Sequence, residues 1–348
     1  IYVLPGTYSG DYNQEINIGQ SYDLTIIGTG SANETIFELT NTFISMSRGS
    51  DLDIQNITFT GTTVNGYALS ASGEGGYTTS LTLDSCKFVN FSQSGAVRLY
   101  SYMTGNISNC VFGGNTYNSL GTAIRVGAYN TVNLSGCLFY DNQDVNNSSY
   151  HYGTIYADLS HYTINIDGCT FYDNGGEGSV AIYDGNNSSG SKWINVTNSI
   201  FYSDVIDAEH TNLSATYSLI YDVEGEGNFY NDPLFCDVDS SDFTLYNNSP
   251  CAGTGEDGAH IGALGVGCGT YSGDIGDNIT VGESPYYISP DGNEFASGTV
   301  DDPFGSLEVA YSYLDEESER IIYVLPGTYS GPYNQGITLS DDLSIIGV

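Results

Sequence analysis

Residues 132–142 read VNLSGCLFYDN, and residues 164–174 repeat the same pattern as INIDGCTFYDN. Each segment alternates apolar and polar residues, then places a Cys and a Phe two positions apart, and ends on Asp-Asn. Related segments recur at intervals of roughly 20 to 30 residues, which is the length of one coil in a solenoid. These related segments lie at 51–61, 81–91, 105–115, 194–204 and 213–222.

The alternation predicts short strands whose apolar side chains all point to one side. One coil cannot bury its inward side chains alone, whereas stacked coils place equivalent residues on one another and build a continuous core. We therefore predict an all-β fold, a right-handed parallel β-helix. The predicted core columns are Cys86, Cys110, Cys137 and Cys169, and Phe88, Phe112, Phe139, Phe171 and Phe201.

The composition agrees with strands and tight turns, because the 348 residues include 44 Gly, 30 Tyr and 14 Phe. The net charge of −36 would repel a phosphate backbone, so we expect no nucleic-acid partner. Two readings of this charge remain open. It is either a solvated extracellular surface, which is preferred, or a set of carboxylates that collects Ca²⁺.

No metal site or cofactor is expected, with Ca²⁺ kept as the alternative because acidic residues alternate within 237–242. No apolar stretch reaches about 18 residues, so we expect no membrane insertion of this segment. His151, His161, His210 and His260 lack the spacing of metal ligands.

The sequence also contains a second, longer repeat. Residues 1–18 read IYVLPGTYSGDYNQEINI, and residues 322–339 read IYVLPGTYSGPYNQGITL. The match resumes as DLTIIG at 23–28 and DLSIIG at 342–347. We expect the chain to cover slightly more than one period of a tandem array and its natural N-terminus to lie further upstream.

The long repeat predicts three parts. Residues 1–268 form a β-helix module that lacks its own N-terminal cap, residues 269–285 form a Gly-, Ser- and Asp-rich linker, and residues 286–348 form a capping helix and the first coil of the next module. The helix is expected over 303–316, with Asp302 as its N-cap and Pro303 in its first turn.

This cap is expected to cover the open end of a β-helix core, because an uncovered end exposes strand edges and apolar columns. The expected partner is a neighbouring copy of the same module. The residues predicted to make this assembly contact are Ile1, Tyr2, Val3, Leu4, Phe304, Leu307, Tyr311, Leu314, Ile322 and Val324.

The two edges of the module carry a family resemblance. The opening reads YYISPDGNEFASGTVDDPFGSLEVA at 286–310 followed by IIYVLPGTYSG at 321–331, and the close reads NDPLFCDVDSSDFTLYNNSPCAGTGEDGAHIGALGVGC at 231–268. These segments resemble the edges of pectin-lyase-like right-handed β-helix proteins of microbial surfaces, including adhesin-like members with tandem repeats. The resemblance implies the fold more strongly than a function, because this fold hosts lyases, hydrolases, tailspikes and adhesin-like proteins.

The resemblance raises two catalytic hypotheses, and a structural alternative is preferred for each. Arg98 and Arg125 occupy equivalent places on adjacent coils and would bind an acidic sugar, or they are surface arginines paired with nearby carboxylates. Asp141, Asp173 and Asp204 recur after the Phe position and would form a hydrolase site, or they belong to a ladder of turn residues with Asn115, Asn142 and Asn174. We therefore predict no catalytic residues and no enzymatic activity.

The cysteines of the coils and of the closing segment call for different explanations. The four coil cysteines are expected to be buried as small hydrophobes. One disulfide is expected among Cys236, Cys251 and Cys268 in an extracellular setting. The pairing is open, with a slight preference for Cys236–Cys251, which leaves Cys268 unpaired.

Asparagines in Asn-x-Ser/Thr sequons fall into two groups. Those explained by the coil motif itself are Asn56, Asn106, Asn133, Asn195, Asn212 and Asn278. Those in loops expected to project are candidate glycosylation sites, namely Asn146, Asn147, Asn186 and Asn187.

The sequence therefore favours a structural subunit or tandem repeat of an extracellular surface fibre, in which modules join end to end. The alternative is an adhesin-like surface protein whose Tyr- and Asp-rich loops bind carbohydrate. A polysaccharide lyase or hydrolase is the least favoured function.

Overall fold

The computed structural model describes residues 1–61, 66–77, 79–92, 94–117, 121–144, 153–157, 160–174, 180–185, 190–209, 211–271, 285–290, 292, 297–301, 303–312, 314, 320–329 and 343–348. The chain divides into two compact units, Ile1–Gly269 and Thr270–Val348. Most of the expected linker 269–285 lies outside the described residues.

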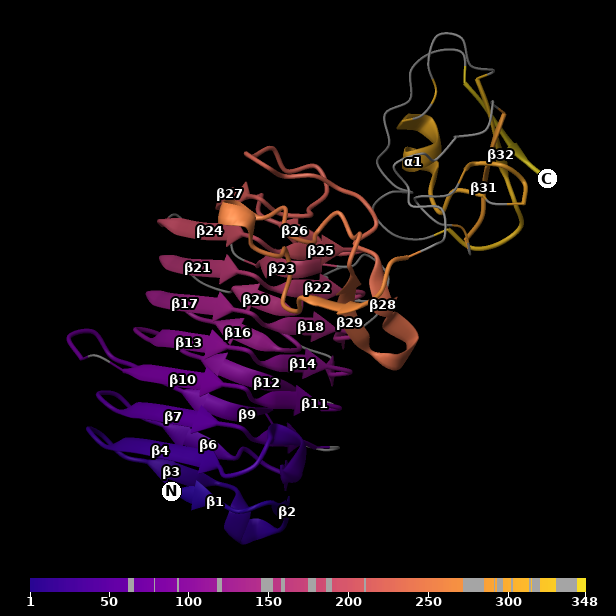
Figure 1. The fold of residues 1–348 in the computed structure, drawn as a ribbon. Coiled ribbons are helices and arrows are strands. Elements are labelled where there is room, and N and C mark those ends of the chain that lie inside the picture. The colour runs from indigo at the N-terminus through magenta and orange to yellow at the C-terminus, as the bar shows by residue number, and fades with distance from the viewer. Residues whose placement is uncertain are drawn as a thin grey trace. The chain divides into compact units, whose positions relative to one another are not determined.

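The first unit is a parallel β-helix with three long sheets, as the coil pattern predicts, and its coils stack one above another in Figure 1. Sheet 1 comprises β1 (Tyr2–Val3), β4 (Asp23–Gly28), β7 (Asp51–Gln55), β10 (Ser80–Asp84), β13 (Thr104–Ser108), β17 (Asn130–Ser135), β21 (Tyr162–Asp167), β24 (Lys192–Thr197) and β27 (Asn212–Thr216).

Sheet 2 comprises β2 (Gly6–Tyr8), β5 (Thr35–Glu38), β8 (Thr58–Thr60), β11 (Lys87–Val89), β14 (Val111–Gly113), β18 (Leu138–Tyr140), β22 (Thr170–Tyr172) and β25 (Ile200–Tyr202). Sheet 3 comprises β3 (Ile16–Ile18), β6 (Ile44–Met46), β9 (Gly66–Ala71), β12 (Ser94–Leu99), β16 (Ile124–Val126), β20 (Ile155–Ala157), β23 (Val180–Asp184) and β26 (Val205–Asp207). The short strands β15 (Thr116–Tyr117) and β19 (Gln143–Asp144) pair beside them.

Neighbouring strands pair in a register that places equivalent coil residues on one another. Phe112 pairs with Phe139, and Phe139 pairs with Phe171. The centroids of neighbouring rings lie 4.9 Å apart for the first pair and 4.5 Å apart for the second. The five predicted phenylalanines, Phe88, Phe112, Phe139, Phe171 and Phe201, therefore form one buried column that also includes Phe59.

The corner between sheets 1 and 2 explains the polar residues that precede the cysteine position. In the coils from β7 to β27, the residue just before that position takes a left-handed backbone conformation, which Gly and Asn adopt most readily. The residues in this conformation are Asn56, Ser85, Asn109, Gly136, Gly168, Asn198 and Tyr217. A repeated corner of one geometry keeps the coils in register.

The predicted cysteine column lies directly after this corner. Cys86, Cys110, Cys137 and Cys169 are fully buried thiols. The amide of Cys137 donates to Sγ of Cys169 at 3.4 Å, and the amide of Cys169 donates to Oγ of Ser199 at 3.0 Å. Burial raises the pKa of the Cys110 and Cys169 thiols, which favours the neutral thiol.

The C-terminal end of the β-helix is closed by its own chain. Leu219 bridges to Ile200 of β25 and to Phe229, so that residues 218–229 lie over the last coil. Beyond them, β28 (Phe235–Asp237), β29 (Asp242–Tyr246) and β30 (Val266–Cys268) form a small sheet. Short 3-10 helices are η1 (Asp11–Asn13), η2 (Ala32–Glu34), η3 (Val238–Ser240) and η4 (Glu256–Gly258).

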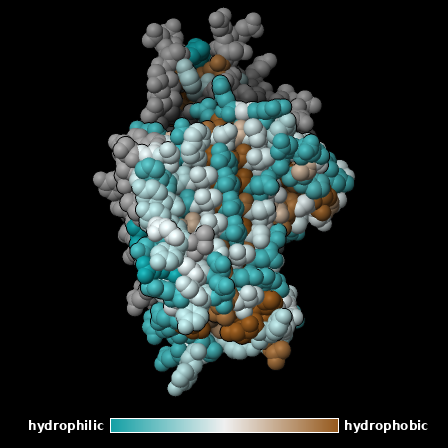
Figure 2. Space-filling view, turned by 90° about the vertical axis from the view of Figure 1, so that its left-hand side faces the viewer, coloured by the Kyte–Doolittle hydropathy of each residue, from teal (hydrophilic) through white to brown (hydrophobic). Residues whose placement is uncertain are grey.

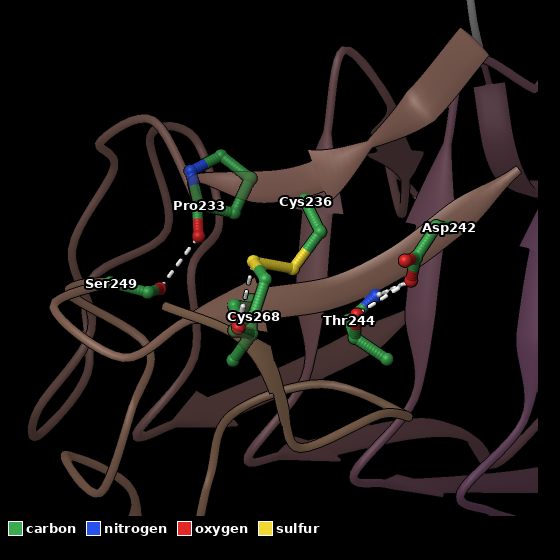
Figure 3. The surroundings of a disulfide bond; sticks show 7 residues. Pro233, Cys236, Asp242, Thr244, Ser249 and Cys268 are labelled. Atoms are coloured by element: carbon green, nitrogen blue, oxygen red, sulfur yellow. Dashed lines mark hydrogen bonds between the residues drawn. A yellow bond between two sulfur atoms is a disulfide. The ribbon is translucent and has the colours of Figure 1, made fainter. Parts of the chain in front are cut away.

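The disulfide joins Cys236 to Cys268 and ties β28 to the last strand of this small sheet (Figure 3). The preference for Cys236–Cys251 was therefore wrong. Cys251 is a buried thiol whose amide donates to Oγ of Ser249, and it packs in an apolar cluster with Leu219. Sequence spacing could not show that β30 returns beside β29, which brings Cys268 close to Cys236.

The second unit contains the sheet β31 (Tyr286–Ile288), β32 (Ile321–Val324) and β33 (Ser344–Gly347), with the helix α1 (Leu307–Ser312). This helix is shorter at its start than the expected 303–316. Phe304 lies in extended backbone and exchanges hydrogen bonds with β31, since its amide donates to Tyr287 and its carbonyl accepts from Ser289. Oγ of Ser306 accepts from the amide of Val309, so Ser306 serves as the N-cap of this helix. The expected N-cap, Asp302, lies outside the described residues.

Replacing a member of the phenylalanine column tests the stacked core. Phe139→Ala removes a fully buried ring between two others and is expected to lower the free energy of unfolding by about 3–5 kcal/mol. Denaturant unfolding followed by circular dichroism measures this loss. Tyr12→Ala, at a side chain that is 100% exposed, is the control and should change the value by less than about 0.5 kcal/mol. Equal losses for the two variants would contradict the stacked core.

Candidate functional site

The two arginines proposed to bind acidic sugars lie side by side on sheet 3. Arg98 of β12 pairs with Arg125 of β16. The Arg98 guanidinium lies 3.9 Å from the ring centroid of Tyr100, and that of Arg125 lies 5.9 Å from the centroid of Tyr156. Aromatic faces attract guanidinium groups, so these rings help to hold both side chains in place. The sequence predicted the stacking of the arginines but not their tyrosine partners.

The three aspartates considered for hydrolysis do not form one column. Asp141 and Asp173 occupy left-handed corner positions two residues after the phenylalanine, where Ser203 stands in the next coil. Asp204 lies one residue further on, in the column of Asn142 and Asn174. Counting from the phenylalanine separates the two columns, so the proposed grouping of Asp141, Asp173 and Asp204 was wrong.

A buried ladder of amides ends at Asp204. Nδ2 of Asn115 donates to Oδ1 of Asn142 at 2.8 Å, and Nδ2 of Asn142 donates to Oδ1 of Asn174 at 2.7 Å. Both the amide N–H and Nδ2 of Asn174 donate to the Asp204 carboxyl, each at 2.8 Å. Each asparagine also donates to a phenylalanine carbonyl, so the ladder supplies partners to backbone groups at the corner between sheets 2 and 3.

A buried ion pair is the feature that the sequence analysis missed. Nζ of Lys192 lies 2.9 Å from Oδ2 of Asp184, and both side chains are buried. The hydroxyl of Thr211 donates to Oδ2 of Asp184 at 2.6 Å and lies 2.8 Å from the hydroxyl of Tyr162. The alternation of the strand could have predicted a buried lysine, because Lys192 precedes the inward Ile194 by two positions. Lys192 also pairs with the inward Tyr162. This network holds Asp184 of β23 and Lys192 of β24 together, because leaving either buried charge unpaired would destabilise the fold.

A hollow of 410 Å³ opens at the corner between sheets 3 and 1. Arg48 forms an ion pair with Glu74 there, and its Nη2 donates to Oε1 of Gln20 at 3.3 Å. The ring of Tyr77 lies 4.9 Å from the Arg48 guanidinium. The lining residues are Gln20, Ser47, Arg48, Ser72, Gly73 and Glu74.

Further along the same corner, aromatic side chains stack on the surface. The rings of Tyr102 and Tyr129 lie 4.7 Å apart and nearly parallel, and the ring of His161 continues the stack at 4.8 Å. Tyr102 is 42% exposed and Tyr129 is 48% exposed, so their edges are open to solvent. Columns of like side chains also run along the outer surface of the β-helix in Figure 2.

One such outer column consists of asparagines on sheet 1. Nδ2 of Asn133 donates to Oδ1 of Asn106, Nδ2 of Asn165 to Oδ1 of Asn133, and Nδ2 of Asn195 to Oδ1 of Asn165. These side chains bond to one another, which agrees with a structural reading of the sequons at Asn106, Asn133 and Asn195. The candidate glycosylation sites Asn146, Asn147, Asn186 and Asn187 lie outside the described residues.

The N-terminal end of the β-helix differs from its closed C-terminal end. Ile1 is 69% exposed, Tyr2 is 78% exposed and Leu4 is 67% exposed, whereas Val3 points into the core. Hydrophobic residues gather at this end in Figure 2, at the lower end of the view. The sheet order begins with β1, so within the described residues no strand covers its outer edge.

The other predicted assembly residues gather within the second unit. Phe304 and Ile322 are fully buried there, together with Tyr286, Ile288 and Ala310. The partly buried residues that pack against this cluster include Leu307, Tyr311, Leu314 and Val324. The cap therefore covers the second copy of the repeated strand.

Residues 42–216 match the family described as the right handed beta helix region. The chain belongs to this family. The match confirms the expected right-handed β-helix and covers the coils that carry the phenylalanine and cysteine columns. A search of curated proteins found no match to this right-handed β-helix chain.

Two further observations concern the parts of the β-helix protein that the structure describes. Within those residues, no group of three or more His, Cys, Asp or Glu side chains is arranged to hold a metal ion. No helix among them is long and apolar enough to cross a membrane.

The carboxyl at the end of the amide ladder makes stability depend on pH. Burial raises the pKa of Asp204 well above its usual range, because the charged form is desolvated. Because the pKa of Asp204 is raised in the folded state, its protonated carboxyl stabilises the fold fully below about pH 4. This stabilisation is lost as the pH rises through the folded-state pKa. Asp204→Asn removes that loss and is expected to raise the thermal midpoint at pH 7 but not at pH 3.5.

Thermal melts across this pH range measure the effect, and each unit of raised pKa corresponds to about 1.4 kcal/mol. Asp141→Asn is the matched control, because Asp141 is exposed at the corner and should show no such gain. A midpoint for Asp204→Asn that stays at or below that of the parent at pH 7 would rule out a destabilising buried charge.

Proposed function

We propose that this β-helix protein is a repeat unit of an extracellular surface fibre in which modules join end to end. The supporting observation is that both copies of the repeated segment fold in one register. Tyr2 pairs with Ile27 in the first unit, and Tyr323 pairs with Ile346 in the second. These pairs occupy equivalent positions of the long repeat, so one local structure recurs at both places.

The internal ladders suit a load-bearing role. Within the described residues, each strand of the three long sheets pairs in parallel with a strand of at least one neighbouring coil, and rings, thiols and amides stack through the same coils. In such a solenoid each coil is stabilised by its neighbours, and length grows without changing the cross-section. We therefore propose a mechanical role, in which the module gives the fibre its length and stiffness, without a catalytic role or a cofactor.

An extracellular location is part of the proposal. The disulfide between Cys236 and Cys268 closes the C-terminal sheet, and such bonds persist in oxidising compartments. The net charge of −36 would keep neighbouring fibres apart in solution.

Electron microscopy of the native source material tests this proposal. An antibody raised against the 348-residue chain should label thin filaments at a regular spacing along their length. The control is the same labelling after the antibody has been adsorbed with the purified chain. Labelled particles that are free and globular, with no filaments, would remove the fibre proposal.

A second candidate function is carbohydrate binding, which the stacked rings of Tyr102, Tyr129 and His161 favour. The exposed edges of these rings, next to polar groups, are suited to sugar rings, which combine apolar C–H groups with hydroxyls. The corner hollow at Arg48 supplies such polar groups along the same edge of the β-helix. A neutral polysaccharide would fit best, because the net charge of −36 repels an acidic one.

Affinity electrophoresis in gels that contain soluble neutral polysaccharides tests this second function. The parent should be retarded, and the double variant Tyr102→Ala/Tyr129→Ala should lose most of the retardation. Tyr12→Ala is the control, because Tyr12 is exposed but belongs to no aromatic stack in the described residues. The hypothesis fails if no polysaccharide retards the parent, or if the double variant is retarded as strongly as the parent.

A further inference from the structure

The two copies of the repeated segment form the same internal contacts. The hydroxyl of Tyr8 donates to the carbonyl of Leu4 at 2.8 Å, and that of Tyr329 lies 2.8 Å from the carbonyl oxygen of Leu325. The amide of Thr29 donates to the carbonyl of Val3, just as the amide of Val348 donates to that of Val324. The repeated segment is therefore one structure seen twice, and differences between its copies come from their surroundings.

The second copy has a neighbour that the first copy lacks. Strand β31 pairs with β32, matching Tyr286 to Ile322 and Ile288 to Val324. The carbonyl of Ile288 accepts from the amide of Leu325 at 3.0 Å and lies 2.8 Å from the hydroxyl of Tyr329. At the equivalent place in the first copy, no described residue accepts from the amide of Leu4.

The side chains show the same difference. Ile322 is 0% exposed beneath the cap, whereas the equivalent Ile1 is 69% exposed. The ring of Tyr323 stacks 5.0 Å from that of Tyr287, whereas the equivalent Tyr2 is 78% exposed. The first copy thus presents to solvent the surface that the second copy buries.

A glycine common to both copies fits the same contact. A Cβ on Gly327 would lie only 2.2 Å from Cγ of Pro290, so the cap approaches the backbone too closely for a side chain. The equivalent Gly6 has no such neighbour, since its nearest contact would be 3.8 Å away on Tyr8. The first copy therefore keeps the space that the proline of a cap would fill.

We infer that the free edge of β1 is a docking site for a capping segment with the fold seen at residues 285–290 and 303–312, supplied by another copy of the repeat. A strand equivalent to β31 pairs with β1, its carbonyl accepts from the amide of Leu4, and its proline lies over Gly6. The inference deepens the proposed fibre, because this contact would join one module to the next.

The test compares the 348-residue chain with the same chain preceded by a second copy of residues 285–321, joined as residue 321 is joined to residue 322. Amide hydrogen exchange at Leu4 is the readout, and Leu325 in the same molecule is the internal reference. In the parent, Leu325 should be protected and Leu4 should exchange freely. The extension should raise the protection of Leu4 by at least about tenfold, toward that of Leu325.

The matched control carries Phe304→Asp in the added copy alone, which buries a charge in the cap core and should leave Leu4 unprotected. The inference is overturned if Leu4 stays unprotected in the extended chain while Leu325 is protected, because Leu325 shows that the segment folds and docks in that molecule. It is also overturned if Leu4 is equally protected in the control that carries Phe304→Asp, because the protection would then not depend on a folded cap.

Hydrogen exchange at Leu4 tests the docking site independently of whether the protein forms a fibre. Protection of Leu4 without filaments in the source material would retain the docking site and remove the fibre. Filaments without protection of Leu4 would retain the fibre and require a different joint between modules.

Discussion

The structure depends on one constraint, which is that equivalent residues of successive coils must lie directly above one another. Only then can the strands exchange all their backbone hydrogen bonds and the inward side chains close the space between the three sheets. The left-handed corner residue, the cysteine position and the phenylalanine position recur at fixed offsets because a shift of one residue would turn the core side chains outward. The same constraint makes the two ends special: residues 218–229 cover the last coil at the C-terminal end, whereas within the described residues no strand pairs with the outer edge of β1.

The interior shows how polar groups meet this constraint. The asparagine ladder succeeds because an amide side chain can both donate and accept, so identical residues satisfy one another along the column. Asp204 closes this ladder by accepting two hydrogen bonds from Asn174, and burial opposes the charged form of its carboxyl. Lys192 and Asp184 neutralise each other in an ion pair, and the hydroxyl groups of Thr211 and Tyr162 extend the network. Polar residues are thus placed where the coil geometry leaves backbone or side-chain partners within reach.

Much of the fold could be predicted from the sequence, because a period of two and a fixed corner motif constrain each coil locally. The stacking of Phe112 on Phe139 and of Arg98 on Arg125 follows from counting residues within the motif. The predictions that failed depended on long-range contacts or on finer counting. The partner of Cys236 is decided by the return of β30, and the start of α1 by the pairing of Phe304 with β31. Tyr156 lies in β20 and pairs with Arg125, so the same counting could have placed it, whereas Tyr100 lies beyond the end of β12, in a corner whose length varies between coils.

The repeated corner has a consequence for how such a molecule changes over time. From β7 to β27, each coil turns from sheet 1 toward the next segment through the same left-handed corner residue and pairs with its neighbours in the same register. A duplicated or deleted coil would therefore leave both flanking surfaces matched, and the remaining columns would close across the change. The overall length can evolve in steps of one coil, while the loops between strands vary independently of it.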